Sequence, residues 1–198
     1  SIGKVVKKLE EFGISENTVI IFTSDHGDLL GDHQLILKGP IHYNGLIRVP
    51  FIWADTPDRA EPGTSDALSG TIDIAQTILD RANFEPYYGI QGRSLLPEIN
   101  GSEDQGPGSV LIEQEDQREY FGLKAPIRLR TLVTNRYRLT IYHGNDWGEL
   151  YDLQSDPSEI NNLWDDPQYT LTKLELLETL SRQQMALTDF GPLPTKLA

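Results

Sequence analysis

The sequence of 198 residues contains no cysteine. This absence excludes disulfide bonds and thiolate metal ligands within the chain, and it leaves the redox compartment undetermined. Long hydrophobic runs are also missing, because no apolar stretch approaches the roughly 18–20 residues that a helix needs to span a bilayer. A disulfide-stabilised scaffold, a zinc–thiolate centre and a membrane-spanning helix are therefore not expected from these residues.

Positive charge is scarce as well. The chain carries 17 lysines and arginines against 30 aspartates and glutamates, which gives a formal net charge of −13. Nucleic acid binding depends on lysine and arginine to neutralise phosphates, so this balance argues against a nucleic acid partner. A deep site for a small anion is still compatible with it, because one metal ion and one lysine can set the local sign of the charge.

A continuous apolar run near the start of the chain ends in polar residues. Residues 19–22 (VIIF) suit a strand that is buried on both faces of a parallel sheet, and the sequence SDHG follows. Open α/β sheets bind ligands at the carboxyl ends of their strands. Asp25 and His26 can offer one oxygen and one nitrogen to a divalent cation, and Gly27 allows the backbone to turn sharply.

Further titratable residues crowd the next part of the chain. Lys38 follows Asp25 by thirteen residues, and His33 and His42 lie on either side of this lysine. Together with His26, three of the four histidines fall within seventeen residues. This concentration predicts a functional site between residues 25 and 42.

Four blocks of sequence follow one another in a recognisable order. SDHG, LGDH and a lysine before YNGLIRVPFI come first, and IDIAQTILD with GIQGRSLLP, then ELYDLQSDPSEINNL, are weaker matches further on. This set resembles the sulfatases of the alkaline-phosphatase-like superfamily, such as arylsulfatases and iduronate sulfatases. The resemblance covers nearly the whole chain and corresponds to the C-terminal portion of such an enzyme.

The resemblance implies roles for three residues. In such enzymes the aspartate of the SDHG block and the residue after it bind the active-site metal, which gives Asp25 and His26 as metal ligands here. A pair of this kind prefers a hard or borderline divalent ion, so Ca²⁺ is expected, with Mg²⁺ and Mn²⁺ as alternatives. The downstream lysine binds the sulfate group, so Lys38 is the expected catalytic and substrate-binding residue, its ammonium a point charge on a sulfate oxygen.

Each of these residues could instead have a purely structural role. Asp25 and His26 could form an ordinary turn after a strand, and Lys38 could be a surface side chain that extends from an apolar segment. His33 and His42 are candidate substrate-binding residues, and either imidazole could act as a general acid because it titrates near neutrality. A supporting role is the alternative for His33, and for His42 the two readings stay open.

The nucleophile of these sulfatases is absent from the chain. They carry a formylglycine made from the Cys or Ser of a C/S-x-P-S/A-R motif near their N-terminus, and no such motif occurs in these residues. We therefore expect a C-terminal fragment whose partner in the active site is the N-terminal part of the same enzyme. Alone, the chain should be inactive and should bind metal weakly. Its cellular location stays undetermined.

Composition and length predict a folded α/β protein in two parts. Hydrophobic residues make up 38% of the chain and charged residues 24%, and the length suffices for a domain with a small lobe. Residues 1–108 are predicted to be the C-terminal part of an α/β catalytic domain, with a mixed sheet flanked by helices. Residues 109–198 are predicted to form a small antiparallel α+β subdomain.

The expected elements of the first part are two helices and two strands. Apolar residues at three- and four-residue spacing predict helices over 2–12 and 72–82, the second capped by Thr71. Buried strands are expected over 19–23 and 48–53. Residues 97–108, rich in Gly, Pro and acidic residues, are expected to form a loop.

The second part is predicted to be a meander closed by a helix. Short β-prone runs occupy residues 110–113, 130–134, 137–142 and 149–153, with Asn135 and Arg136 as a tight hairpin turn. Asp166 and Pro167 should open a final helix, because proline suits the first helical position. Leucines at 171, 174, 177 and 180 are expected to be its core stripe.

These observations predict a metal-dependent hydrolase of sulfate esters. The first alternative is a phosphodiesterase or phosphonate monoester hydrolase of the same superfamily. The second is a relative that binds anions without catalysis. The nature of the alcohol or sugar that carries the sulfate is not readable from these residues.

Overall fold

The computed structural model describes residues 1–56, 62–102, 106–120 and 122–188. Its helices and strands form a mixed α/β structure with one two-stranded and one four-stranded sheet. In chain order they are α1 (Ile2–Glu11), β1 (Ile20–Thr23), α2 (Asn44–Ile47), β2 (Phe51–Ala54), α3 (Asp73–Arg81), α4 (Leu96–Ile99), β3 (Ser109–Asp116), β4 (Ile127–Thr134), β5 (Tyr137–Tyr142), β6 (Gly148–Asp152) and α5 (Thr170–Ala186), with 3₁₀ turns at Ser15–Asn17, Asp32–Gln34 and Pro167–Tyr169.

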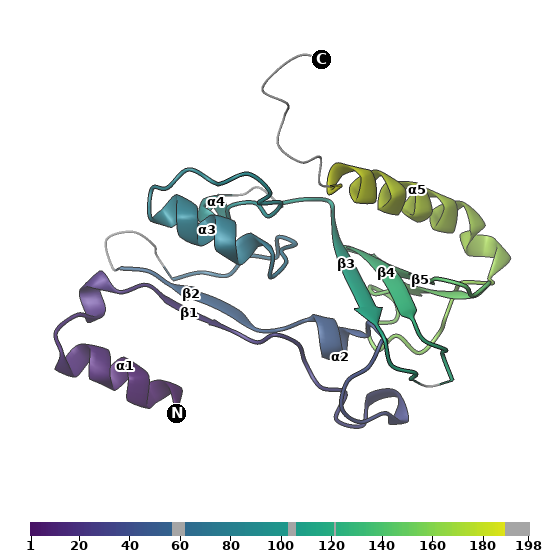
Figure 1. Cartoon of the computed structure of the whole chain (residues 1–198), viewed down its shortest axis with the longest axis horizontal. Helices are drawn as coiled ribbons and strands as arrows, with labels where there is room; N and C mark the ends of the chain where they lie inside the picture. The colour runs from purple at the N-terminus through teal and green to yellow at the C-terminus, as the bar shows by residue number, and fades with distance from the viewer. Residues whose placement is uncertain (57–61, 103–105, 121, 189–198) are drawn as a thin grey trace, which may run out of the picture.

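These elements separate into two ends of the molecule. Figure 1 shows α1, α3, α4 and the two-stranded sheet at one end, and the four-stranded sheet with α5 at the other. The connection from β1 to β2 reaches toward the four-stranded sheet, and α2 lies on this connection. We call β3–β6 together with α5 the C-terminal lobe. The predicted boundary near residue 108 stays a prediction.

Within the described residues the first sheet is antiparallel, and parallel neighbours for β1 stay a prediction. β1 pairs with β2 in antiparallel register, with Ile20 opposite Ala54 and Thr23 opposite Phe51, and all four β1 residues are only half-buried. In the described residues β1 has no parallel neighbour. An apolar run indicates that a strand needs cover on its faces, but it does not fix the direction of the neighbouring strand.

The start of β2 was predicted wrongly. Arg48 is the C-cap of α2 and not the start of a strand, and β2 begins at Phe51, directly after Pro50. Proline lacks the N–H that a strand ladder needs, so the pairing starts after it. β2 alternates between half-buried and exposed residues, and Ile52 is 57% exposed. The strand is therefore not buried within this chain.

Helix α3 begins without the predicted cap. Thr71 lies outside the helix, and no side chain caps it through a hydrogen bond at the N-cap position. The buried carboxylate of Asp73, the first residue of α3, instead holds two other segments at the helix start: it accepts from the backbone N–H of Gly70 at 2.9 Å and from that of Arg93 at 2.9 Å. The contact between Asp73 and Arg93 spans twenty residues, so it cannot be predicted from the residues next to the helix start.

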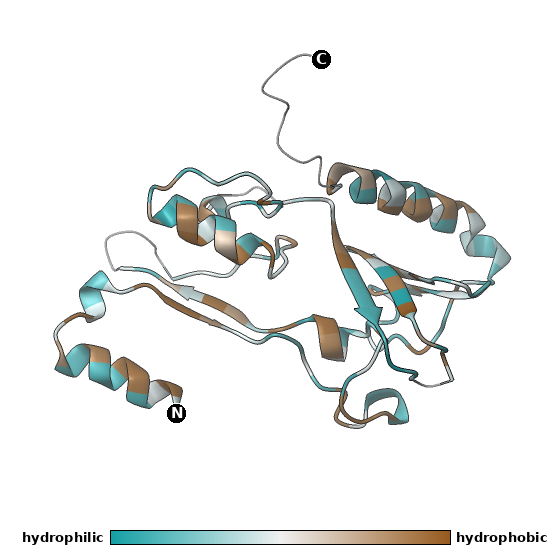
Figure 2. Ribbon diagram, viewed as in Figure 1, coloured by the Kyte–Doolittle hydropathy of each residue, from teal (hydrophilic) through white to brown (hydrophobic). Residues whose placement is uncertain are grey.

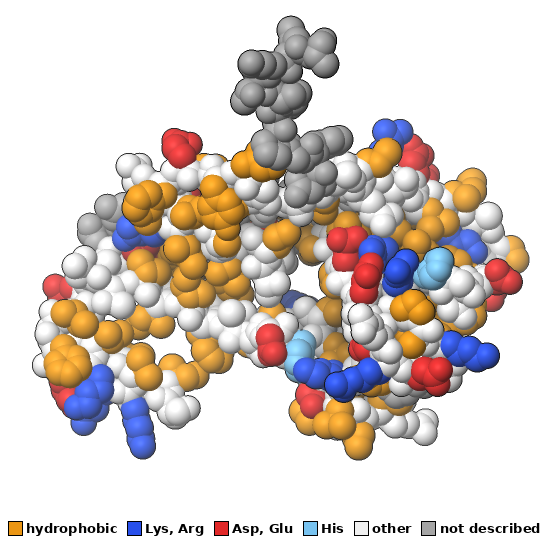
Figure 3. All heavy atoms as spheres, viewed as in Figure 1, with side chains coloured by type: hydrophobic (Ala, Val, Ile, Leu, Met, Phe, Trp, Pro, Cys, Tyr) orange, Lys and Arg blue, Asp and Glu red, His pale blue; other side chains and the backbone are white. Residues whose placement is uncertain are grey.

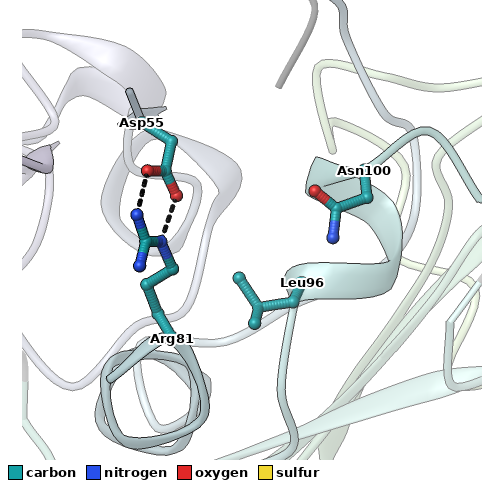
Figure 4. Close-up of a pocket in the computed structure, with 4 residues that line it drawn as sticks. All are labelled: Asp55, Arg81, Leu96 and Asn100. Atoms are coloured by element: carbon teal, nitrogen blue, oxygen red, sulfur yellow. Dashed lines mark hydrogen bonds and ion pairs between the residues drawn. The ribbon is translucent and has the colours of Figure 1, made fainter. Parts of the chain in front are cut away.

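An ion pair ties α3 to the end of β2. Arg81 Nε lies 2.6 Å from Asp55 Oδ2, and Arg81 Nη2 lies 2.7 Å from Asp55 Oδ1 (Figure 4). Hydrogen bonds from Arg81 hold the pKa of the Asp55 carboxyl below its usual range. Leu96 and Asn100 complete a shallow pocket beside this pair. Leu96 begins α4, so the predicted loop over 97–108 starts as a short helix, and residues 103–105 lie outside the described residues.

The C-terminal lobe has the predicted architecture. Its strands form an antiparallel meander in the order β3-β4-β5-β6, and the turn between β4 and β5 falls at Asn135 and Arg136 as predicted. The Asp166 side chain accepts from the N–H of Gln168 and opens the final helical segment, which is also as predicted. The core of the lobe consists of five fully or nearly buried leucines: Leu132, Leu139, Leu150, Leu176 and Leu180.

The leucine stripe of α5 was predicted only in part. Leu180 is 1% exposed, but Leu171 and Leu174 are 75% and 56% exposed. Leu176, four residues before Leu180, is buried in their place. Residues four apart stay on one face of a helix better than a run of three-residue steps, which rotates away from the sheet.

Apolar surface is left open at the end of the molecule that carries α1. None of the residues of α1 is buried, although apolar and polar residues share this helix as they share α5 (Figure 2). Hydrophobic side chains also gather over α3 and the segment after it (Figure 3), where Phe84 and Tyr87 are 66% and 69% exposed. Among the described residues, no helix combines the length and the apolar character needed to cross a membrane.

Candidate functional site

The predicted aspartate and histidine follow β1 at an exposed turn. The Asp25 side chain is 82% exposed, and its Oδ1 accepts from the backbone N–H of His26 at 2.9 Å. Ser24 donates from its hydroxyl to the carbonyl of His26 at 2.8 Å. The backbone N–H of His26, and then the electrostatic effect of the neighbouring imidazole, lower the pKa of Asp25. Asp25 is therefore held as a carboxylate.

The ring of His26 is oriented by its own loop. Its Nδ1 lies 2.7 Å from the carbonyl oxygen of Gly27, which can only accept, so Nδ1 carries the hydrogen and donates. Nε2 is then left with a lone pair. A histidine with this arrangement presents Nε2 to a cation, and the carbonyl fixes the tautomer and the ring orientation.

Lys38 reaches this lone pair from the far end of the loop. Its Nζ lies 2.6 Å from His26 Nε2, and Asp25 Oδ2 lies 3.4 Å from the same nitrogen. The structure thus brings together the three residues that the sequence singled out most strongly. An ammonium, a carboxylate and an imidazole nitrogen converge on one exposed point.

These donors fit one part of a metal site. Two ligands 3.4 Å apart suit neighbouring positions around a cation with bonds of about 2.0–2.6 Å. The described residues contain no group of three or more His, Cys, Asp or Glu side chains that could hold a metal. Asp25 and His26 could supply two ligands, and His26 Nε2 would exchange its hydrogen bond with Lys38 for the cation. Metal binding stays a prediction.

Gly27 has a different role from the predicted turn. Its N–H donates to the carbonyl of Leu46 at 2.8 Å, and a Cβ at this position would lie 1.9 Å from the carbonyl oxygen of Gly45. A side chain at 27 would collide with the backbone of α2. The glycine is required for the close approach of the Asp25–His26 turn to α2.

His33 lies apart from this cluster. Its ring stacks on Tyr43 with ring centroids 3.6 Å apart and an angle of 8° between the planes. Its backbone φ of 54° lies in the left-handed region within the turn Asp32–Gln34. The contact with Tyr43 gives His33 a place in the packing of the loop, and its substrate-binding role stays a prediction.

His42 is inside the molecule. It is 5% exposed, and its Nδ1 and Nε2 lie 2.8 Å from Thr131 Oγ1 and 2.9 Å from Gln114 Oε1. Burial lowers the pKa of His42 to about 4, so the ring is neutral at pH 7. Both ring nitrogens face the C-terminal lobe rather than Lys38. The prediction that His42 contacts substrate stays a prediction.

Sequence reasoning missed a buried charged cluster beside this loop. Arg138 on β5 is 0% exposed and pairs with Glu149 and Glu159, which are also buried. From the sequence, Glu149 was predicted only to lie in a β-prone run over 149–153. An arginine inside an apolar strand was the available signal, because a charge is buried only with partners.

Comparison with known proteins defines the class of this chain. Residues 31–186 match the family described as N-sulphoglucosamine sulphohydrolase, C-terminal. The chain is 31% identical over 196 residues to the N-acetylglucosamine-6-O-sulfatase of Bacteroides thetaiotaomicron, and this match covers 97% of the chain and 34% of that protein. It thus spans about a third of the length of this relative.

Solved structures agree with this match. A structure described as a complex with its substrate D-glucosamine-2-N,6-O-disulfate superimposes with a TM-score of 0.83 at 30% identity, over 98% of this chain and 40% of that one. The phosphonate monoester hydrolase of Agrobacterium radiobacter gives 0.83 at 28% identity, over 94% and 39%. The fold is that of the C-terminal part of alkaline-phosphatase-like sulfatases. The chain belongs to the sulfatase family whose C-terminal region it matches.

Proposed function

We propose that this chain is the C-terminal part of a hydrolase of sulfate esters, in which Lys38 binds the sulfate group beside Asp25 and His26. The observation that carries the proposal is the convergence of these residues, with Lys38 Nζ 2.6 Å and Asp25 Oδ2 3.4 Å from His26 Nε2. Membership of the sulfatase family supports the reaction class.

Each of the three side chains has a distinct task. Lys38 places a positive charge on a non-bridging sulfate oxygen and stabilises the charge that develops there during hydrolysis. Asp25 and His26 would hold a divalent cation, with Ca²⁺ as the first choice and Mg²⁺ or Mn²⁺ as alternatives. When bound, that cation polarises the ester oxygens. The Gly27 carbonyl keeps His26 in the tautomer that offers Nε2.

The nucleophile and the remaining metal ligands come from the N-terminal part of the same enzyme in this proposal. Two facts support this: the chain spans 34% of a curated relative, and these residues contain no cysteine. The described residues also offer only two ligands at the site, whereas a hard cation such as Ca²⁺ takes six or more.

A second candidate function is phosphonate monoester hydrolysis. The hydrolase of this type from Agrobacterium radiobacter superimposes as well as the sulfatase complex does, with a TM-score of 0.83 in both cases. Sulfate and phosphonate monoesters both present several oxygens to a lysine and a cation, so the residues of this chain do not separate them.

The direct test is turnover by the purified full-length enzyme on matched aryl esters. We expect hydrolysis of an aryl sulfate faster than of the corresponding aryl phosphonate. The Asp25→Ala variant should lose metal content, measured by elemental analysis, and turnover with it. Asp28→Ala, an exposed aspartate of the same loop, is the control. Faster phosphonate turnover would favour the second candidate, and equal metal content in Asp25→Ala and the parent would remove the ligand assignment.

A further inference from the structure

A buried charged cluster in the C-terminal lobe reaches the loop that carries the candidate site. Arg138 Nη1 lies 2.8 Å from Glu149 Oε2 and 2.9 Å from Thr140 Oγ1, and Arg138 Nε pairs with Glu159 Oε1. Burial alone lowers the pKa of the Arg138 guanidinium, but the carboxylates of Glu149 and Glu159 raise it above its usual value. The cluster is a fixed ionic arrangement, since removing Arg138 would leave two buried carboxylates without their guanidinium partner.

The second carboxylate oxygen of Glu159 accepts a hydrogen bond from helix α2. Glu159 Oε2 accepts from the backbone N–H of Asn44, the first residue of that helix, at 2.7 Å. No side chain at the N-cap of α2 forms a capping hydrogen bond. A carboxylate at a helix start satisfies an N–H that has no partner within the helix and complements its partial positive charge. The lobe therefore supplies this contact from a residue 115 positions downstream.

Helix α2 also contacts the turn that carries the candidate site. The N–H of Gly27 donates to the carbonyl of Leu46 at 2.8 Å, and a Cβ on Gly27 would lie 1.9 Å from the Gly45 oxygen. There is no space between α2 and the turn that carries His26. A displacement of α2 must therefore displace the backbone that orients the His26 ring.

The residue before α2 is held by the same arginine. The guanidinium of Arg138 lies over the ring of Tyr43 at 5.1 Å from its centroid and over that of Tyr151 at 4.7 Å. Tyr43 in turn stacks on His33. Arg138 thus contacts both the carboxylate that holds α2 and the aromatic side chain at its N-cap.

We propose that Glu159 and Arg138 are positioning residues, which fix α2 and, through Gly27, the placement of Asp25 and His26. In this proposal both act through α2 and Gly27, since both side chains are buried. The inference rests on the proposed function for the relevance of Asp25 and His26 to turnover. A misplacement of about 1 Å can lower a rate on the order of 10²-fold, so a buried pair outside the reacting groups can control catalysis.

The experiment compares two substitutions of buried carboxylates in the full-length enzyme. Glu159→Gln keeps the size of the side chain but can satisfy only one of the contacts to Arg138 and Asn44. Asp152→Asn is the matched control, because Asp152 is 2% exposed and pairs with Arg136 at 2.8 Å. Among the described residues no hydrogen bond of the Asp152 side chain to the loop 24–47 is found. Both variants are measured by aryl sulfate kinetics, thermal unfolding and amide hydrogen exchange.

The two variants should differ in kcat/KM and in amide exchange. Glu159→Gln should lower kcat/KM by about 10-fold to 100-fold, chiefly through kcat, and speed amide exchange in residues 24–47. Asp152→Asn should lower the melting temperature but keep kcat/KM within about 3-fold of the parent. Equal losses in both variants, or unchanged kinetics and exchange in a folded Glu159→Gln, would overturn the proposal. If Glu159→Gln does not fold, Glu159→Asp, which keeps the charge but shortens the reach, takes its place.

Hydrogen exchange keeps this test separate from the proposed function. If the parent enzyme hydrolyses no sulfate ester, the proposed function fails. Faster exchange in residues 24–47 for Glu159→Gln but not for Asp152→Asn would still support the positioning of α2. Unchanged exchange in both would overturn it.

Discussion

The C-terminal lobe and the end of the molecule that carries α1 bury their apolar residues to very different extents. In the lobe, Leu132, Leu139 and Leu150 are 0% exposed, whereas Phe12 and Ile52 at the other end are 72% and 57% exposed. Both ends contain hydrophobic residues interspersed with polar ones (Figure 2). The difference shows that a hydrophobic pattern predicts which face of a helix or strand is packed against other residues, but not which segment packs on it.

The lobe finds its cover within the chain, because α5 packs on the sheet. For α1, β1 and β2 we expect the cover to come from the rest of the enzyme, since the chain spans 34% of a curated relative. The candidate site lies on the incompletely covered part, and the lobe holds it through buried contacts from Glu159 and Thr131. The lobe therefore buries its own hydrophobic core, whereas α1, β1 and β2 leave apolar side chains exposed.

The largest expected effect concerns catalysis by the chain alone. These 198 residues alone should hydrolyse no aryl sulfate above background, because the proposed function places the nucleophile in the N-terminal part of the enzyme. The half-buried strands β1 and β2 should also make the isolated chain prone to aggregation. Incubation of the purified chain with an aryl sulfate, with Asp25→Ala as the control for contamination, measures this. Turnover that disappears in Asp25→Ala would contradict the expectation.

A core substitution in the lobe should cost stability without reaching the site. Leu139→Ala removes a side chain that is 0% exposed in the five-leucine core. The expected loss is about 2–5 kcal/mol of unfolding free energy, because the cavity left behind collapses only in part. Urea unfolding of the full-length enzyme, with exposed Leu171→Ala as the control, decides it. A loss below that of Leu171→Ala would mean that the lobe core is not where the structure places it.

Lys38→Ala should affect turnover and leave stability alone. We expect kcat/KM to fall on the order of 10²-fold, comparable with the loss of one oxyanion donor, and the melting temperature to change little because Lys38 is exposed. Lys7→Ala, an exposed lysine on α1, is the control for lost surface charge. Steady-state kinetics of the full-length enzyme test both variants. A loss within about 2-fold for Lys38→Ala would identify it as an ordinary surface lysine.

His42 should make stability depend on pH, an effect that is absent near neutrality and appears only below about pH 6.5. Its pKa is about 4 in the folded protein and 6.5 as the ordinary value, so the unfolded chain takes up the proton first as the pH falls. The stabilisation is complete above pH 6.5 and is lost toward pH 4, with a slope that approaches about 1.4 kcal/mol per pH unit. Urea midpoints at several pH values for the parent and His42→Gln measure it. Equal slopes in both would contradict a buried, neutral His42.

Local features of this chain could be predicted from the sequence. The order of strands in the lobe, the turn at Asn135 and Arg136 and the opening of the last helix at Asp166 depend on residues within a few positions of one another. The same holds for Asp25 and His26, which follow a strand end as expected. The cap of α3 at Thr71 and the start of β2 at residue 48 were predicted wrongly, and parallel neighbours for β1 stay a prediction because they would come from outside the described residues.

By itself, the sequence singled out Asp25, His26 and Lys38 as candidate site residues, because they share one short segment and because that segment resembles the sulfatases; their roles stay predictions. Only the tertiary structure decided how they are held. The partners of His42 lie 72 and 89 residues away, and the carboxylate on α2 comes from 115 residues away. Burial sets the protonation state of His42, and the hydrogen bond from Asn44 to Glu159 sets the position of α2. Both depend on tertiary structure, because burial and this hydrogen bond form only when distant segments of the chain pack together and exclude water.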